Sequence, residues 1–188
     1  MRISAIILLI ALGACSRPQR ASAHEEPVAE RGCQAVATEA WRPTPGAEYT
    51  VVARTSGPDC EHAIASIAIR DVQNTVLWTD AYATAQLVTL AHARNIETMQ
   101  TELGEWINSS NRTMATTSAL PDWPEGSQAP ENREFPFHLE AGVDRATYMA
   151  LRARNAPMFC FVQGMESMAC LALENGALSK VGVQSFPG

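Results

Sequence analysis

Histidine is the first residue type to consider for chemistry, because an imidazole can act as a general base or bind a metal near neutral pH. The chain has four histidines: His24, His62, His92 and His138. No two of them have the spacing of a metal motif such as HExxH, so we expect no metal site and no cofactor. His92 lies on an apolar helical pattern, where we expect it to be hydrogen-bonded inside the core. His138 follows Phe135-Pro136-Phe137 in a predicted loop and is a candidate binding residue.

Other catalytic patterns are missing from the sequence. A serine hydrolase needs a nucleophile beside a positioned base, yet no serine lies in a G-x-S-x-G elbow. Glu102 and Glu105 are one helical turn apart, which favours a solvated helix face over a pair of carboxylates across a cleft. These observations favour a protein that is not an enzyme. The alternative is a hydrolase whose site assembles from distant residues, such as one of the histidines and a carboxylate.

Tryptophan is the more informative aromatic residue. Trp78 and Trp106 fall on apolar faces and are expected in the core. Trp123 lies in the proline-rich stretch Leu120-Pro121-Asp122-Trp123-Pro124. There an exposed indole could anchor a sugar or a protein partner, or it could pin the loop to the domain. Trp123 therefore joins His138 as a candidate binding residue.

The N-terminus has the pattern of an export signal. Arg2 precedes an apolar run from Ile3 to Leu12. About ten apolar residues are too few to cross the hydrocarbon core of a bilayer, but they match the apolar region of a secretory signal peptide. The run leads directly into Leu12-Gly13-Ala14-Cys15, which resembles the lipobox of bacterial lipoproteins.

That resemblance implies an anchor. Residues 1–14 would be removed, the thiol of Cys15 would carry a diacylglycerol, and the new amino group would be acylated, so that several chains hold the protein to a membrane. Ser16, where an aspartate would imply retention in the inner membrane, implies the outer membrane, facing the periplasm. The pattern Ala21-Ser22-Ala23 indicates an alternative, in which an ordinary signal peptidase cleaves after it and releases a soluble periplasmic or secreted protein.

The four cysteines beyond Cys15 predict two disulfides, because an even number in an exported chain is typical of structural bridges. A three-residue loop at 164–166 would place Cys160 directly opposite Cys170 in a hairpin, within the distance that a disulfide spans. Cys33–Cys60 follows by elimination. We expect both bridges to be structural.

Residues 15–47 have the composition of a lipidated cysteine followed by a flexible tether, with few large apolar side chains. Residues 48–188 are expected to form a single globular domain. From residue 48 onward the chain has nine Arg and Lys against 16 Asp and Glu, and the net charge of the whole chain is −6. An acidic chain of this kind favours no nucleic-acid partner.

The first half of the domain predicts a strand over 48–54 and a hairpin over 62–82 that pairs Ile69 with Val76 and Ile67 with Trp78. A long helix is expected over residues 84–107, because apolar side chains recur there every three or four residues. That stripe consists of Val88, His92, Ile96, Met99, Leu103 and Trp106.

The second half predicts a strand over 113–120, a long loop, and a helix over Arg145–Arg154 with Asp144 as its N-cap. Three strands follow, joined by the 164–166 loop and by Asn175-Gly176, which favours a type I′ turn. They are expected over 157–163, 167–174 and 177–185. Alternation places apolar side chains on both faces of this sheet, so we expect it to be covered on both sides.

The sequence therefore predicts an α+β fold of antiparallel hairpins packed with two helices and stapled by disulfides. The function it favours is that of a non-enzymatic envelope lipoprotein, held to the membrane by its lipid, that binds an envelope protein or a cell-wall component or has a structural role there. An inhibitor of lysozyme and an accessory protein of an envelope assembly are specific alternatives.

Overall fold

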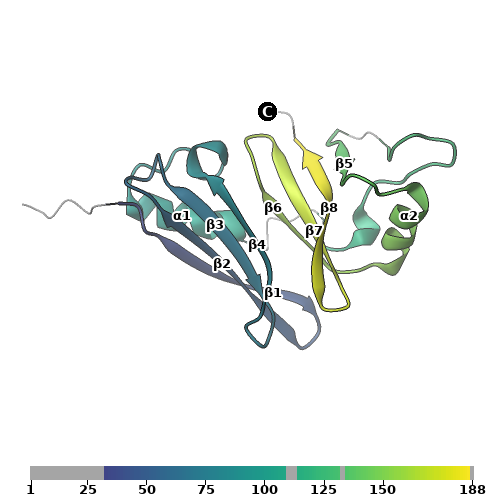
Figure 1. Ribbon diagram of the computed structural model, residues 1–188, viewed down its shortest axis with the longest axis horizontal. Helices are drawn as coiled ribbons and strands as arrows, with labels where there is room; N and C mark the ends of the chain where they lie inside the picture. The colour runs from purple at the N-terminus through teal and green to yellow at the C-terminus, as the bar shows by residue number, and fades with distance from the viewer. Residues whose placement is uncertain (1–31, 109–113, 132–133, 187–188) are drawn as a thin grey trace, which may run out of the picture.

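The computed structural model describes residues 32–108, 114–131 and 134–186. These residues form two four-stranded antiparallel sheets with two α-helices and two disulfides, which confirms the predicted α+β fold. In Figure 1 helix α1 lies behind the first sheet, and helix α2 lies beyond the second. Among the described residues, no helix combines the length and the apolar character needed to span a bilayer.

The first sheet is a meander in which each strand pairs with the next along the chain. Its strands are β1 (Val36–Thr44), β2 (Ala47–Ser56), β3 (Ile64–Arg70) and β4 (Val76–Ala83). One face buries Val51, Ala53, Ile67 and Ile69, as the alternation of β2 and β3 requires. Helix α1 (Ile96–Ile107) packs along β1 and β2, with the side chain of Asn95 capping its N-terminus by accepting a hydrogen bond from the N–H of Thr98.

The prediction of a flexible tether is wrong for residues 33–47, because this segment contains strand β1. The buried alanines here, Ala35 just before β1 and Ala37 within it, are too small to give a clear apolar pattern, and Pro43 and Pro45 give the segment a linker-like composition. Trp41 nevertheless lies buried. The predicted disulfide Cys33–Cys60 is confirmed, with Cα atoms 4.8 Å apart, and it ties the start of this segment to the loop before β3.

The β3–β4 hairpin is confirmed, but its predicted register is wrong by two residues. Ile69 lies opposite Trp78, because the turn extends through Thr75 and the register shifts beside Arg70. The carboxylate of Asp71 accepts hydrogen bonds from the N–H groups of Gln73 and Thr75 and so stabilises the longer turn. A shift of two residues leaves each side chain on its predicted face, and Trp78 still packs against the core.

The long helix predicted over 84–107 is wrong in its first half, because α1 begins at Ile96. The buried hydroxyl of Thr84 donates to the backbone oxygen of Cys60, and a 3-10 turn, η1 (Thr84–Gln86), follows at the end of the first sheet. Leu87 and Leu90 are buried by the turns that continue from it. His92 is exposed in these turns, so its predicted place inside the core is also wrong.

The second sheet has the order β5-β8-β7-β6. Its strands are β5 (Phe137–Leu139), β6 (Met158–Val162), β7 (Ser167–Glu174) and β8 (Ala177–Ser185). The three-residue loop at 164–166 and the disulfide Cys160–Cys170 are confirmed, with the Cα atoms of the two cysteines 4.1 Å apart. Asn175 and Gly176 both have positive φ angles, 52° and 77°, as a type I′ turn requires.

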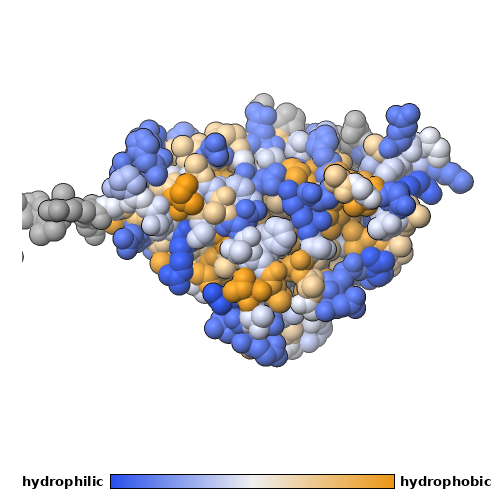
Figure 2. Space-filling view, in the orientation of Figure 1, coloured by the Kyte–Doolittle hydropathy of each residue, from blue (hydrophilic) through white to orange (hydrophobic). Residues whose placement is uncertain are grey.

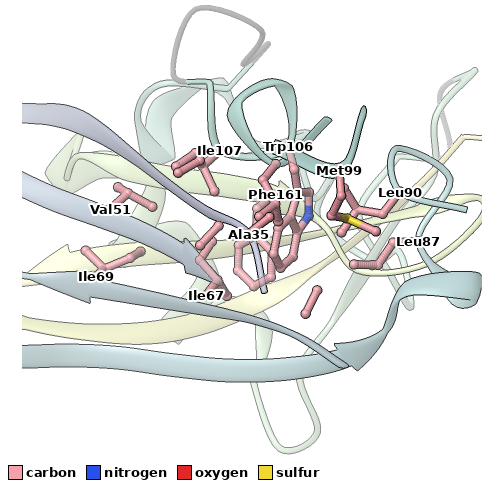
Figure 3. Close-up of a cluster of buried hydrophobic side chains, with 14 of the residues drawn as sticks. Ala35, Val51, Ile67, Ile69, Leu87, Leu90, Met99, Trp106, Ile107 and Phe161 are labelled. Carbon is pink, nitrogen blue, oxygen red and sulfur yellow. The ribbon is translucent and has the colours of Figure 1, made fainter. Parts of the chain in front are cut away.

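Apolar clusters cover both faces of the second sheet, as predicted. Phe159 and Phe161 face the first sheet and α1, and Figure 3 shows the rings of Phe161 and Trp106 next to each other in this first core. The indole N–H of Trp106 donates to the backbone oxygen of Val162 over 2.8 Å. The opposite face forms a second core with helix α2 (Arg145–Arg154), whose limits and Asp144 cap match the prediction.

The strand predicted over 113–120 is wrong within the described residues. Thr116 makes an isolated bridge to Pro157, and a short 3-10 helix, η3 (Thr117–Ala119), follows. The hydroxyl of Thr117 donates to the backbone oxygen of Leu151 and accepts a hydrogen bond from the N–H of Ala156. These bonds hold the segment against the last turn of α2 and against the connection between α2 and β6, where it forms only the isolated bridge.

Strand β5 approaches β8 so closely that only glycine fits at position 182. A Cβ atom there would lie 2.3 Å from the backbone oxygen of His138 and 2.7 Å from a ring carbon of Phe137. Gly104, in the middle of α1, is the opposite case, since a Cβ atom there would meet no other atom within 4 Å.

We therefore expect Gly182→Ala and Gly104→Ala to change stability in opposite directions. Gly182→Ala should displace β5 and lower the free energy of unfolding by about 1–3 kcal/mol. Gly104→Ala should raise it by roughly 0.5–1 kcal/mol, because alanine restricts the unfolded chain and favours the helix. Urea unfolding of both variants measures the effect, and an unchanged midpoint for Gly182→Ala would contradict the close approach of β5.

Candidate functional site

A pocket of about 360 Å³ lies between β5 and the loop that follows η3. Trp123 and His138, the two candidate binding residues of the sequence, both line it. The described residues that line it are Trp123, Gln128, Ala129, Pro130, Phe137, His138, Leu139 and Val143. The pocket therefore joins two segments of the chain that the sequence alone does not place together.

Helix α2 fixes the loop that forms the first wall of the pocket. Arg145, Tyr148 and Arg152 are three and four residues apart, so they lie along one face of the helix. Each donates a side-chain hydrogen bond to a backbone oxygen of the loop: Arg145 to Trp123 over 2.8 Å, Tyr148 to Pro121 over 2.7 Å, and Arg152 to Leu120 over 3.0 Å. The position of this wall therefore depends on the packing of α2.

Trp123 is 8% exposed, so most of its indole belongs to the fold. Its ring meets Tyr148 edge to face with the centroids 5.7 Å apart, and its N–H donates to the backbone oxygen of Ser127 over 2.8 Å. Of the two roles that the sequence left open, the structure favours the one in which the indole pins the loop. The part of Trp123 that borders the pocket contributes an apolar wall and no free N–H.

Strand β5 forms the second wall. Phe137 is buried against the second core, while His138 is exposed opposite Val183 of β8. The close approach allowed by Gly182 holds this short strand in place. Its backbone is thus fixed by β8, and the imidazole of His138 lies at the solvent side of the pocket.

The described lining residues offer hydrogen bonds and apolar contact. Among the described lining residues, Gln128 and His138 have the polar side chains that can reach a ligand, and none of these described side chains is a carboxylate, hydroxyl or thiol. Such a site can orient a small uncharged ligand. The sequence does not indicate Gln128 as a site residue, since nothing in its neighbourhood distinguishes it from other polar loop residues.

The other described histidines lie elsewhere. The ring of His62 is 2.8 Å from the carboxylate of Asp59 on the loop before β3. Hydrogen bonds from the backbone N–H and the ring of His62 hold the pKa of Asp59 below its usual range. Both side chains are largely exposed, so water screens the pair. His92 and His138 lie in different elements, and His24 is outside the described residues.

The remaining predicted site residues separate into two groups. The four cysteines of the disulfides are buried in the cores, in agreement with a structural role. Cys15 and the lipobox lie outside the described residues, so lipidation stays a prediction. Within the described ranges, no group of three His, Cys, Asp or Glu side chains could hold a metal ion.

Comparisons with models of known protein families, with curated proteins and with solved structures found no match.

The cap of α2 should make the pocket wall sensitive to acid. Hydrogen bonds from Thr147, above all from its backbone N–H, hold the pKa of Asp144 below its usual range. A carboxylate whose pKa is lowered by folding contributes stability above its unfolded pKa of about 4, and that contribution is lost as the pH falls through the folded pKa.

We expect Asp144→Asn, which keeps a capping oxygen but does not titrate, to lose this pH-dependent part of the stability. The difference between the wild-type chain and Asp144→Asn should be largest near pH 6 and should shrink toward pH 2. Thermal unfolding followed by circular dichroism measures it, with Glu125→Gln, an exposed residue of the loop, as the control. An identical pH dependence of the wild-type chain and Asp144→Asn would rule out the contribution of the cap.

Proposed function

We propose that this protein is a bacterial envelope lipoprotein that binds a small uncharged ligand, such as a glycan fragment of the cell wall, without transforming it. In this proposal Cys15 carries the lipid and holds the protein to the outer membrane, with the folded domain in the periplasm. The observation that carries the anchor is the sequence Leu12-Gly13-Ala14-Cys15, placed directly after a short apolar run.

The disulfides support the proposed compartment. Cys33–Cys60 and Cys160–Cys170 are both closed, and disulfides persist in oxidising spaces such as the periplasm. Both bridges connect elements of the cores described above, so a reducing compartment would remove two constraints on the fold.

The lining of the pocket supports the proposed class of ligand. Gln128 offers an amide and His138 an imidazole, which match hydroxyl and acetamido groups. Phe137, Leu139 and Val143 supply apolar surface against which the carbon-bound hydrogens of a sugar ring can pack. Among the described lining side chains, a strongly charged ligand would lose its water without meeting an opposite charge.

Lipidation is tested with the full-length chain expressed in a Gram-negative host and labelled with an alkyne analogue of palmitate. We expect the wild-type chain to be labelled, to fractionate with the outer membrane and to begin at Cys15 by mass spectrometry. Cys15→Ala should be unlabelled, whereas Ala23→Arg, which blocks the alternative cleavage pattern, should be processed like the wild type. An unlabelled mature chain that begins at His24 would overturn the proposed anchor.

Ligand binding is tested by titrating the protein with N,N′-diacetylchitobiose, followed by NMR chemical shifts. We expect millimolar binding, with shifts centred on β5 and the Trp123 loop. Because a lost hydrogen bond costs about 1 kcal/mol, Gln128→Ala and His138→Ala should each weaken binding roughly five- to tenfold. His92→Ala changes an exposed histidine outside the pocket and should have no effect. Binding that neither pocket variant weakens would contradict this site.

A further inference from the structure

Strand β1 is an edge strand of the first sheet, so half of its backbone groups do not face another strand of that sheet. The N–H of Val36 donates to the side-chain oxygen of Gln100 over 3.0 Å, and the side-chain N–H of Gln100 donates back to the backbone oxygen of Val36. Both backbone groups of Val36 therefore point away from β2. The two strands pair without interruption from Val36 to Trp41. The same direction recurs at every second residue, so the backbone groups of Thr38 and Ala40 also point outward.

The outer side of β1 is covered at one end and open in the middle. The glutamine of α1 covers it at Val36, and Pro43 at the other end has no N–H. Among the described residues, no hydrogen bond satisfies the outward N–H and C=O groups of Thr38 and Ala40. We call residues 38–42 the open edge. Unpaired groups of this kind are a template for a further strand.

A second pocket, of about 340 Å³, lies beside the open edge. One wall belongs to β1, and the other belongs to β6 and to the segments that precede β6 and η3. This chain therefore bounds the space on both sides, which favours a single extended segment over the sheet of a second copy. The described residues that line it are Ala40, Trp41, Arg42, Pro43, Ala115, Thr116, Pro157 and Met158.

The face of the first sheet that points away from α1 carries positive charge, and we call it the open face. None of its described residues on β1, β2 and β3 is buried. Alternation along these strands places Arg42, Arg54 and Arg70 on it. Glu48 is the only acidic side chain that the three described strands add to this face. Because salt screens charges beyond roughly 8–10 Å, a ligand here meets these arginines rather than the distant acidic residues of the chain.

The arginines of the open face remain available to a ligand. Arg54 is exposed and has no ion-pair partner among the described residues. Arg42 pairs with Glu48, but both side chains are largely exposed, so the pair contributes little and can exchange. In Figure 1 α1 lies behind the first sheet, so Figure 2 views the open face, where apolar residues lie in small groups between hydrophilic ones. Recognition on this face therefore depends on charge and not on a broad apolar patch.

We propose that the open edge binds an extended acidic segment of another protein, which adds to the first sheet beside β1. The backbone of the segment pairs with the outward groups of Thr38 and Ala40, as in other cases of strand addition. Every second side chain of the segment then lies on the open face beside Arg42, with Arg54 on the next strand, where an aspartate or glutamate is favoured. The side chains between them lie on the same side as the apolar Trp41. The recognised pattern is an alternation of acidic and apolar residues.

The proposal depends neither on the lipid anchor nor on the glycan pocket, and amide hydrogen exchange of the purified full chain tests it by NMR. In the free chain, the amides of Thr38 and Ala40 should exchange rapidly, whereas those of Ala37 and Glu39, which face β2, should exchange slowly. Adding the peptide acetyl-Glu-Val-Glu-Val-Glu-Val-amide should slow the exchange of Thr38 and Ala40.

The charge and the backbone of the peptide are then varied separately. Replacing its glutamates by lysines should weaken binding by at least about tenfold at low salt. Methylation of every second amide nitrogen removes either the donors that face β1 or those that face away from it. One of the two methylated peptides should therefore fail to bind, while the other should keep most of the affinity.

Variants of the chain test the same site from the other side. Ala40→Pro removes an outward N–H of the open edge and should abolish binding. Thr79→Pro is the matched control, because it removes an outward N–H of β4, the other edge strand of this sheet, and it should leave binding intact. Arg54→Gln should weaken binding about two- to fivefold at low salt and less at high salt, and His138→Ala should not change it. Thermal unfolding of each variant shows that it remains folded.

Several results would each overturn the proposal. Slow exchange of Thr38 and Ala40 in the free chain would show that another part of the chain, or a second copy, already covers the edge. Equal binding of the glutamate and lysine peptides, equal binding of both methylated peptides, or equal losses in Ala40→Pro and Thr79→Pro would remove the charge, the backbone pairing or the position. A failure of the palmitate label or of the diacetylchitobiose titration leaves all of these measurements unchanged, so the proposals fail separately.

Discussion

Both apolar cores depend on the alternation of side chains along the β6–β7 hairpin. Phe159 and Phe161 project toward the first sheet and α1, whereas Met158 and Cys160 project toward α2. A shift of one residue in the register would exchange the two sets and disrupt both cores at once. The three-residue loop sets this register, and the disulfide between the directly opposed Cys160 and Cys170 holds it covalently. The bridge is thus a constraint on the whole domain and not on one hairpin alone.

The second core determines the shape of the candidate pocket, because it holds both walls in place. Tyr148 is fully buried there, and its hydroxyl holds the backbone of the Trp123 loop. On the other wall, Gly182 lets β5 lie against β8 closely enough to bury Phe137. Both walls are therefore backbone segments that are held from behind by residues outside the pocket. A ligand would meet a largely preformed site, which reduces the entropy lost on binding.

The parts of the fold that follow local rules could be predicted, and those set by distant contacts could not. Asp144 and the pair Asn175-Gly176 act within a few residues, so the sequence identifies α2 and the β7–β8 turn. Strand β1 depends instead on its contacts with α1 and β2, and the segment that precedes α1 is held by a distant hydrogen bond from Thr84 to the backbone oxygen of Cys60. For the same reason the sequence could indicate Trp123 and His138 as separate candidate binding residues. It could not predict that they line one pocket with Gln128, because that arrangement results from packing between distant segments.

The position at which the chain enters the domain decides which surfaces an anchor would leave free. Cys33–Cys60 fixes the start of the described chain at the end of the first sheet where β1 begins. In Figure 1, β5 and α2, which carry the pocket, lie at the opposite end of the long axis of the molecule. A lipid at Cys15, as proposed, would therefore hold the domain by its first sheet. The second sheet and its pocket would then be the part of the domain farther from the point at which the chain enters.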